Sequence, residues 1–228
     1  MLRVATYNAH DCIGRDGGYA PDRIAQVISA LHADVVALQE ITLDHAGDVL
    51  AGLEVATGLK AIDGTLFERG VGRYGNLLLT HQPVISQVLH DVSFAGKEPR
   101  GLIEAELEVQ GRSCRVYATH LGLASRERHQ QLARIGTLLG QSNGAAVLLG
   151  DFNVWFGLAA FRPLYDGCFS GTRVRSYPTW FKPLLPLDRV FARAPARVVK
   201  SWRSEEPPAG TASDHFPVVA DICLGLLR

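Results

Sequence analysis

Short runs of β-branched and aliphatic residues, each about as long as one strand, recur through the whole chain. Several of these runs show little alternation between apolar and polar residues, which is typical of strands that are covered on both faces. The strand-like runs are residues 2–7, 34–38, 75–80, 84–89, 102–109, 114–119, 145–149, 187–191, 197–201 and 218–222. Strands of this kind have to be buried between other layers of secondary structure, which strongly constrains the fold.

Helical patterns separate some of the strand-like runs. The clearest covers residues 21–32, where Pro21 suits the first helical position and apolar residues recur at helical spacing. Residues 125–139 form a second pattern, for which Ser125 is the predicted N-cap, and residues 44–56 form a weaker third. Because strand-like runs follow one another in the middle of the chain, we expect an α/β fold with two packed sheets and helices outside them.

Length and composition favour one folded domain over residues 1–228. Hydrophobic residues make up 47% and charged residues 20% of the chain, a balance close to that of globular proteins. The N-terminal sequence has no charged leader followed by an apolar stretch, and no run approaches the roughly 20 apolar residues that span a bilayer. We therefore expect a cytoplasmic monomer without a transmembrane segment.

Polar side chains stand at the ends of the strand-like runs. In α/β folds the loops at strand ends converge and build binding sites. Each of these residues alone could be a helix cap, a turn residue or a hydrogen-bonded edge of the core, but their joint occurrence at strand ends favours a common site. The candidates are Asn8, Glu40, His120, Asp151, Asn153, Asp188, Asp214 and His215.

The types of these residues support metal-assisted hydrolysis of a phosphate ester. A hard cation such as Mg²⁺ prefers oxygen ligands, which Glu40, Asp214 and Asn8 could provide. Asp151 could act as the base for an attacking water, and Asn153, two positions along the chain, could orient that water. The sequence thus contains the groups for binding a metal and for activating water.

Negative charge that develops on the phosphoryl oxygens requires hydrogen-bond donors. His120, His215 and the side-chain amide of Asn153 are the candidates. A histidine in this role needs a fixed tautomer, which a carboxylate on its other nitrogen usually provides, and Asp188 is the candidate partner of His215. Arg100 could bind a substrate phosphate with its fork of donors, although a solvated arginine beside a turn fits the same sequence.

A set of short motifs, taken together, resembles the endonuclease/exonuclease/phosphatase superfamily. The motifs occur in the family's order from residue 6 to residue 215 and so cover nearly the whole chain. They are Thr6-Tyr7-Asn8, Leu38-Gln39-Glu40, Tyr74-Gly75-Asn76, Thr119-His120-Leu121, Gly150-Asp151-Phe152-Asn153, Leu187-Asp188-Arg189-Val190-Phe191 and Ser213-Asp214-His215.

The resemblance implies a four-layer α/β sandwich like that of deoxyribonuclease I, in which two mixed β-sheets pack face to face and are flanked by helices. It implies Mg²⁺ as the cofactor, with Mn²⁺ as a substitute. The residue matching Glu40 is the principal metal ligand in the family, with those matching Asn8 and Asp214 nearby.

The resemblance also implies roles for the remaining candidates. Asp151 would activate or orient water beside Asn153, and His215, backed by Asp188, would contact the phosphate. Asn76 belongs to one of the matching motifs and is a candidate substrate-binding residue, as is Arg100.

Two active functions compete. The favoured one is a Mg²⁺-dependent phosphodiesterase for a small or lipid-derived phosphate ester, because the chain is short and Lys plus Arg equals Asp plus Glu at 23 each. The alternative is a DNA or RNA nuclease or DNA-end-processing enzyme, which would need basic residues clustered on the site face. Those that flank the predicted site loops are Arg69, Arg73, Lys97, Arg100, Arg173, Arg175 and Lys182.

Two further features bear on this choice. Deoxyribonuclease-like and sphingomyelinase-like members of the superfamily have a His at the position that matches His120, whereas apurinic endonucleases typically have a Tyr there. A catalytically inactive binding module is disfavoured, because such a relative would be expected to have lost Glu40, Asp151 or His215.

The long loop over residues 152–185 is rich in Pro, Gly and aromatic residues, so we expect it to border the site. Its aromatic residues Tyr177, Trp180 and Phe181 could form an apolar wall for a ligand or contact a membrane surface. The favoured interpretation is that this aromatic stretch packs under its own loop.

Overall fold

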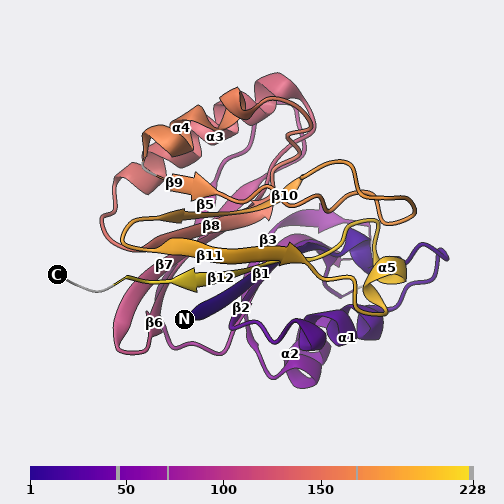
Figure 1. Cartoon of the computed structure of the whole chain (residues 1–228). Coiled ribbons are helices and arrows are strands. Elements are labelled where there is room, and N and C mark those ends of the chain that lie inside the picture. Colours follow the sequence, from indigo (N-terminus) through magenta and orange to yellow (C-terminus); the bar gives the residue numbers. More distant parts are fainter. Residues whose placement is uncertain (45–46, 71, 168, 226–228) are drawn as a thin grey trace.

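The computed structural model describes residues 1–44, 47–70, 72–167 and 169–225, and it has two six-stranded sheets packed face to face. Figure 1 shows helices α1 (Pro21–Leu31) and α2 (Val49–Thr57) outside one sheet, and helices α3 (Ser125–Gly140) and α4 (Arg162–Asp166) outside the other. This arrangement confirms the predicted four-layer α/β sandwich.

The first sheet consists of β1 (Leu2–Asn8), β2 (Val35–Thr42), β3 (Lys60–Arg69), β4 (Gly72–Thr80), β11 (Arg197–Arg203) and β12 (Val218–Cys223). Its strand order is β11-β12-β1-β2-β4-β3. Strand β1 pairs in parallel with β2 and antiparallel with β12, so it lies at the centre of the sheet. The sheet is therefore mixed, as expected.

The second sheet consists of β5 (Val84–Asp91), β6 (Gly101–Val109), β7 (Arg112–His120), β8 (Ala146–Asp151), β9 (Phe169–Gly171) and β10 (Asp188–Arg193). Its order is β5-β6-β7-β8-β10-β9, with β7 and β8 parallel and the other neighbours antiparallel. Three short helices complete the described elements, namely η1 (His10–Cys12), η2 (Leu158–Phe161) and α5 (Ala209–Ala212).

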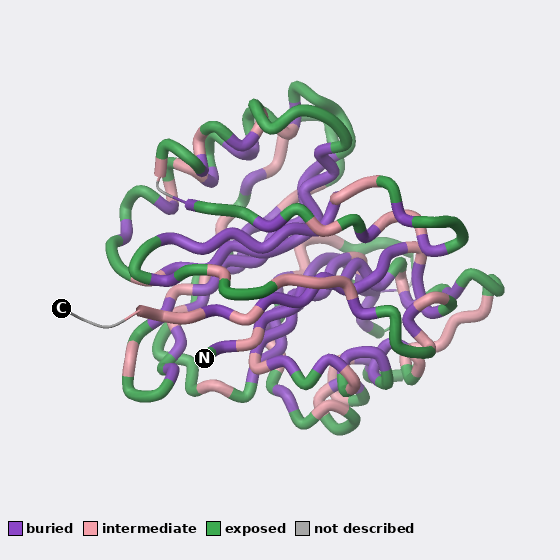
Figure 2. Tube along the Cα trace, in the orientation of Figure 1, coloured by how far each residue is buried: buried purple, intermediate pink, exposed green. Residues whose placement is uncertain are grey.

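Apolar side chains fill three layers, because successive residues of a strand point to opposite faces of a sheet. In β8, Val147 and Leu149 belong to the cluster between the two sheets, whereas Ala146 and Leu148 belong to the cluster on the side of α3 and α4. Buried residues accordingly run through the centre of the molecule in Figure 2. Strands that are covered on both faces explain why the strand-like runs show little alternation.

The sequence patterns do not predict β3 and β9, which are both edge strands. Strand β3 carries charged residues and Gly64, and much of it is partly or fully exposed. Strand β9 has only 3 residues. Strands β5 and β11 are edge strands as well, but their sequences contain apolar runs, which β3 and β9 lack.

The predicted N-cap of α3 is wrong. Ala124 occupies the N-cap position instead of Ser125, and the carboxylate of Glu127 accepts a hydrogen bond from the Ala124 N–H (3.4 Å). The side chain of Glu127 thus bonds to the N–H of the N-cap residue itself, whereas a serine N-cap would have accepted an N–H of the first turn.

The helix predicted over residues 44–56 is observed as α2. It begins after its N-cap residue Asp48, whose carboxylate accepts a backbone N–H of the first turn (2.9 Å). Residues 45 and 46 of that prediction lie outside the described part of the chain. Among the described helices, none is long and apolar enough to cross a membrane.

Candidate active site

The polar residues predicted at strand ends meet at one edge of the sandwich. Strands β1 and β2 are parallel, and Asn8 lies opposite Gln39 where their pairing ends. Strands β7 and β8 are parallel as well, with His120 opposite Asp151, and β10 begins at Asp188 opposite the same Asp151. The carboxyl ends of β1, β7 and β8 and the amino end of β10 therefore meet at this site.

A local irregularity in β2 brings Glu40 into the site. The pairing of β2 with β4 changes register between Leu38 and Ile41, and Glu40 has a φ of 56° within that shift. Positive φ is uncommon for residues other than glycine, and a bulge of this kind redirects a side chain. As a result Asn8 Nδ2 donates a hydrogen bond to Glu40 Oε1 (2.9 Å).

A cavity of about 310 Å³, called here the polar cavity, lies at this edge. The predicted residues that line it are Asn8, Glu40, Arg100, His120, Asp151, Asn153, Asp214 and His215. Asp188 is fully buried behind His215. Asn76 is buried in β4 and is not among the described lining residues, so its role in substrate binding stays a prediction.

Asp151 is a buried carboxylate at the centre of the polar cavity's hydrogen bonds. Its Oδ1 accepts the backbone N–H of Asn153 (2.9 Å), and its Oδ2 accepts a side-chain N–H of Asn8 (3.1 Å). Burial raises the pKa of Asp151 to about 7, and the neighbouring Asp188 adds to this increase, while His215 and the two hydrogen bonds oppose it. A carboxylate that titrates near neutral pH is well suited to accept a proton from water.

His215 and Asp188 form a buried pair. His215 Nδ1 donates to Asp188 Oδ2 (2.7 Å), and the same oxygen accepts the hydroxyl of Ser176 (2.5 Å). Burial alone lowers the pKa of His215, but the carboxylates of Asp188, Asp151 and Asp214 outweigh it and raise this pKa to about 10. The imidazole is therefore cationic at neutral pH, and its Nε2 lies 3.9 Å from Asp151 Oδ2.

Asp188→Asn is expected to lower the pKa of His215 from about 10 to near or below its ordinary value of 6.5, because burial would then be opposed by fewer carboxylates. NMR titration of the carbon-bound imidazole protons measures this pKa directly. Asp214→Asn, which removes a weaker contribution, should lower it less. An unchanged pKa in Asp188→Asn would contradict this account of the pair.

The same pair makes the stability of the fold depend on pH. Because its pKa is raised in the folded state, His215 holds its proton more tightly there than in the unfolded chain. Its contribution to stability is therefore complete below about pH 6.5 and is lost as the pH rises through about 10. The Asp188→Asn protein should lack this contribution in urea unfolding measured across that range.

His120 is also buried, but it is neutral. Burial lowers the pKa of His120 well below 6.5, and the positive charges of Arg100 and His215 lower it further. Its Nε2 accepts a hydrogen bond from Asn153 Nδ2 (3.1 Å), which also donates to the carbonyl of Leu121 (2.9 Å). The donor role predicted for His120 would need the proton on Nε2 instead, so that role stays a prediction.

Two groups of side chains could hold a divalent metal. The first is Glu40 with Asp214, whose side chains are each 24% exposed. Within the described ranges neither carboxylate forms an ion pair with a lysine or arginine, so both are free to bind a hard cation. Asn8 Nδ2 points toward Glu40 and its Oδ1 accepts the His10 N–H (3.0 Å), so Asn8 positions Glu40, and its predicted role as a metal ligand stays a prediction.

The second group is Asp151, Asp188 and His215, whose donor atoms lie within 4.8 Å of one another. In this buried group His215 Nδ1 is already hydrogen-bonded to Asp188. A metal on Nδ1 would have to displace that proton and separate the pair. The open carboxylates of the first group therefore fit a hard cation better than the second group does.

Three aromatic residues of the polar cavity, Tyr74, Trp155 and Tyr177, were not predicted as site residues. The ring of Tyr177 lies 4.9 Å from that of His215, and Trp155 follows Asn153 by two positions. The interpretation that the 177–181 stretch packs under its own loop is wrong for Phe181, which is 64% exposed, whereas Trp180 is 52% exposed and packs edge-on against Tyr177 of the same loop (ring centroids 5.4 Å apart). The aromatic composition of the loop was the signal available in the sequence. Which of these side chains point into the cavity depends on the fold.

Comparisons with known proteins identify related sequences and folds. The family model described as "Endonuclease/Exonuclease/phosphatase family" matches residues 5–215. The Escherichia coli K12 protein named "Uncharacterized protein YbhP" is 33% identical over 171 residues, which cover 67% of this chain and 64% of YbhP. The chain thus spans about 64% of the length of the curated relatives it matches first.

Solved structures share the fold. The endonuclease/exonuclease/phosphatase from Beutenbergia cavernae is 26% identical with a TM-score of 0.80, and the match covers 98% of this chain and 72% of that one. The Bacteroides thetaiotaomicron mannosyl-6-phosphatase Bt3783 is 17% identical with a TM-score of 0.76, and the match covers 98% of this chain and all (100%) of that one. The second likeness concerns the fold alone.

Proposed function

The chain belongs to the endonuclease/exonuclease/phosphatase family, whose members are hydrolases of phosphate esters, and on that premise we propose that it is a Mg²⁺-dependent phosphodiesterase. The observation that carries the proposal is that Glu40, Asp151 and His215 line one cavity although they are far apart in the sequence. The reaction would be an attack of water on phosphorus, in which the bond from phosphorus to the ester oxygen breaks, the alcohol leaves and the water gives a proton to a base.

Asp151 is the proposed base for the attacking water. Its pKa of about 7 lets it be ionised in a large part of the protein at neutral pH and still bind a proton as the reaction proceeds. The hydrogen bonds from Asn153 N–H and Asn8 Nδ2 hold the Asp151 carboxylate in place. Little conformational freedom of this side chain is therefore lost when water binds.

His215 is the proposed donor to the phosphoryl group. Asp188 holds its Nδ1 proton, so Nε2 carries the second proton and can donate it toward the cavity. A cationic donor in a water-poor site stabilises the negative charge of the transition state strongly. Arg100, which also lines the cavity and pairs with Glu98 (2.8 Å), is proposed to bind a phosphate oxygen.

Glu40 and Asp214 are proposed to hold the divalent cation, with Asn8 bracing Glu40. When bound, Mg²⁺ or Mn²⁺ would supply positive charge that stabilises the phosphoryl transition state. The two carboxylates suit this role because both line the cavity, and Asn8 Nδ2 donates to Glu40 and to the proposed base Asp151 alike.

The proposed substrate is a small or lipid-derived phosphodiester. The polar cavity of about 310 Å³ suits a small group, and Tyr177 and Trp155 offer it an apolar wall. The alternative of a nuclease is supported by Arg69 and Arg100, because two of the basic residues that flank the predicted loops line this cavity.

Hydrolysis of bis-p-nitrophenyl phosphate by the purified protein tests the function. We expect activity with added Mg²⁺ or Mn²⁺, loss of activity with EDTA, and recovery when the metal is restored. A parallel panel of phospholipids, sugar phosphates, single-stranded DNA and plasmid DNA identifies the substrate class. Full activity in EDTA would contradict the metal-dependent mechanism, and preferential turnover of DNA at physiological salt would favour the nuclease.

A further inference from the structure

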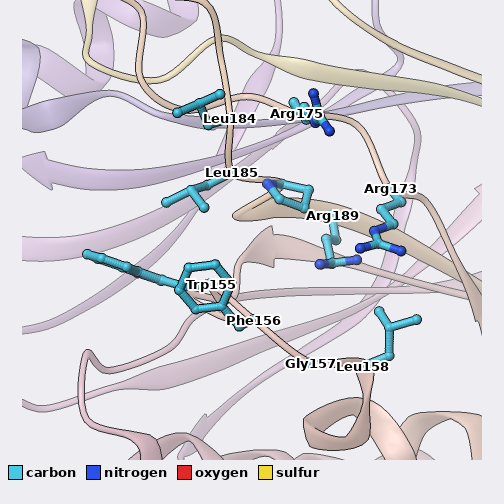
Figure 3. A pocket seen from close by; sticks show the side chains of 10 residues that line it. Trp155, Phe156, Gly157, Leu158, Arg173, Arg175, Leu184, Leu185 and Arg189 are labelled. Carbon is cyan, nitrogen blue, oxygen red and sulfur yellow. The ribbon is translucent and has the colours of Figure 1, made fainter.

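A second cavity lies beside the polar cavity, and the two share Trp155 as a lining residue. This second cavity, called here the arginine cavity, has a volume of about 400 Å³. Figure 3 shows its lining residues, which are Trp155, Phe156, Gly157, Leu158, Arg173, Arg175, Leu184, Leu185, Pro186 and Arg189. They come from the loop after β8, the loop before β10 and β10 itself.

The charge of the arginine cavity is not balanced. It is lined by Arg173, Arg175 and Arg189 and by no carboxylate among its described lining residues. None of these three arginines forms an ion pair in the part of the chain that the structure describes, whereas Arg73, for comparison, contacts both Asp44 and Asp63. Positive charge is thus concentrated here without a protein counter-charge.

Arg189 is the most informative of the three, because it is 4% exposed. Its guanidinium lies 4.6 Å from the centre of the Phe161 ring, and one nitrogen donates to the carbonyl of Thr172 (3.3 Å). Its Nε is buried and has no hydrogen-bond partner among the described residues. A buried cation that lacks both a carboxylate and part of its hydrogen bonds is costly unless a ligand satisfies it.

Arg173 increases that cost. Figure 3 shows the guanidinium of Arg173 beside that of Arg189. The two positive charges interact unfavourably. Burial lowers the pKa of Arg189 to about 10, and Arg173 contributes to this decrease, yet Arg189 is still charged at neutral pH. Two like charges held side by side are unfavourable by themselves and become favourable around a shared anion.

The opposite side of the cavity is aromatic. Figure 3 shows Trp155 and Phe156 across from Arg173 and Arg189. Trp155 is 51% and Phe156 is 84% exposed, so both rings offer open faces. Exposed aromatic faces next to arginines suit a ligand that joins a flat or apolar part to an anionic group.

We propose that the arginine cavity binds a second phosphate group of the substrate, next to the phosphate that is hydrolysed in the polar cavity. The inference rests on the proposed function and deepens it, because it makes the substrate a phosphodiester that carries a further phosphate. Arginine forks bind phosphate oxygens in pairs, which gives the second phosphate a defined position.

The first two residues of β10 serve different cavities. Asp188 and Arg189 are consecutive residues of this strand, so their side chains point to opposite faces of the sheet. One holds His215 and the other lines the arginine cavity. A substrate that spans the two cavities would pass Trp155, which lines both.

Binding of inorganic pyrophosphate in EDTA, measured by titration calorimetry, tests the arginine cavity without any turnover. We expect Arg173→Gln/Arg175→Gln, which changes two exposed residues, to weaken binding at least about tenfold. Arg162→Gln removes an exposed arginine of α4 outside both cavities and should bind like wild type. Equal binding by the double variant and wild type would overturn the proposal, provided that circular dichroism shows both folded.

A matched pair of substrates tests the proposal in catalysis. Thymidine 5′-(p-nitrophenyl phosphate) is compared with the same ester carrying a 3′-phosphate, and we expect the 3′-phosphate to raise kcat/KM about tenfold in wild type, mainly by lowering KM. This preference should disappear in Arg173→Gln/Arg175→Gln and persist in Arg162→Gln. A preference of the same size in the double variant would overturn the proposal.

The source of the second phosphate is distinguished by chain length. If preference keeps increasing from the 3′-phosphorylated ester to p-nitrophenyl esters of longer oligothymidylates, the second phosphate belongs to a nucleic acid strand. If it stops at the single extra phosphate, the substrate is a small bisphosphorylated ester. Both results support the arginine cavity as the subsite.

The two experiments distinguish a wrong assignment of the anion site from a wrong assignment of the phosphodiesterase activity. If no ester is hydrolysed but pyrophosphate binding depends on Arg173 and Arg175, the phosphodiesterase proposal fails and the anion site stands. If bis-p-nitrophenyl phosphate is hydrolysed with Mg²⁺ but neither binding nor preference depends on the two arginines, the anion site fails and the phosphodiesterase stands.

Discussion

Asp151→Asn is expected to reduce kcat for Mg²⁺-dependent hydrolysis by about 10²- to 10⁴-fold, the usual effect of removing a general base. The amide has nearly the same shape as the carboxylate but cannot accept the proton of an attacking water. Its oxygen can still accept the Asn153 N–H (2.9 Å in wild type), so the loop should keep its position. Steady-state kinetics with bis-p-nitrophenyl phosphate at saturating Mg²⁺ measures the effect.

The pH dependence of the same reaction provides a second check on Asp151. Since its pKa is about 7, activity should rise as the pH increases through neutrality and the carboxylate becomes ionised. Asp166→Asn changes an exposed carboxylate of α4 and serves as the control. If Asp151→Asn retained wild-type kcat while Asp166→Asn did too, Asp151 would not be the base.

Glu40→Gln is expected to reduce metal-dependent activity by roughly 10³-fold, because a bound metal contributes several kcal/mol to stabilising the transition state. The amide retains one oxygen but loses the charge that attracts a divalent cation. The measurement is the rate as a function of Mg²⁺ concentration, in which the variant should show weaker metal binding as well as a lower maximum.

Thermal unfolding separates metal binding from catalysis for Glu40. Mg²⁺ at about 100 times its Kd should stabilise the wild-type fold by about 2.7 kcal/mol, since only the folded state has the site. Glu40→Gln should lose this increase. Glu98→Gln, which changes another carboxylate of the polar cavity, should keep it. Loss in both variants would argue for diffuse electrostatic binding rather than a defined site.

The sequence predicts most of the polar residues that line the polar cavity, because a polar residue directly after an apolar run marks the end of a strand. Asn8, His120 and Asp151 directly follow apolar runs, and parallel pairing brings such ends together. The direction in which the Glu40 side chain points could not be predicted from the alternation of side chains along a strand, because it depends on the register shift in β2. Asn76 shows the reverse case, since its motif is present but its side chain is buried in β4.

The arginine cavity could not be predicted from the sequence. In the sequence, Arg189 belongs to an apolar run that indicates a strand, whereas Arg173 and Arg175 belong to a predicted loop. Only the pairing of β10 with β8 brings the loop that carries Trp155 and Phe156 next to them. Strands β3 and β9 were missed for a similar reason, because their own sequences lack an apolar run and their pairing with β4 and β10 makes them strands.

The central claim is that Glu40 and Asp214 hold a divalent cation beside Asp151 and His215. Anomalous scattering from crystals soaked in Mn²⁺ locates the ion directly. We expect one strong peak within bonding distance of Glu40 and Asp214, with the His215–Asp188 hydrogen bond intact. A peak inside the group formed by Asp151, Asp188 and His215, or no peak in the polar cavity at a Mn²⁺ concentration that supports full activity, would contradict it.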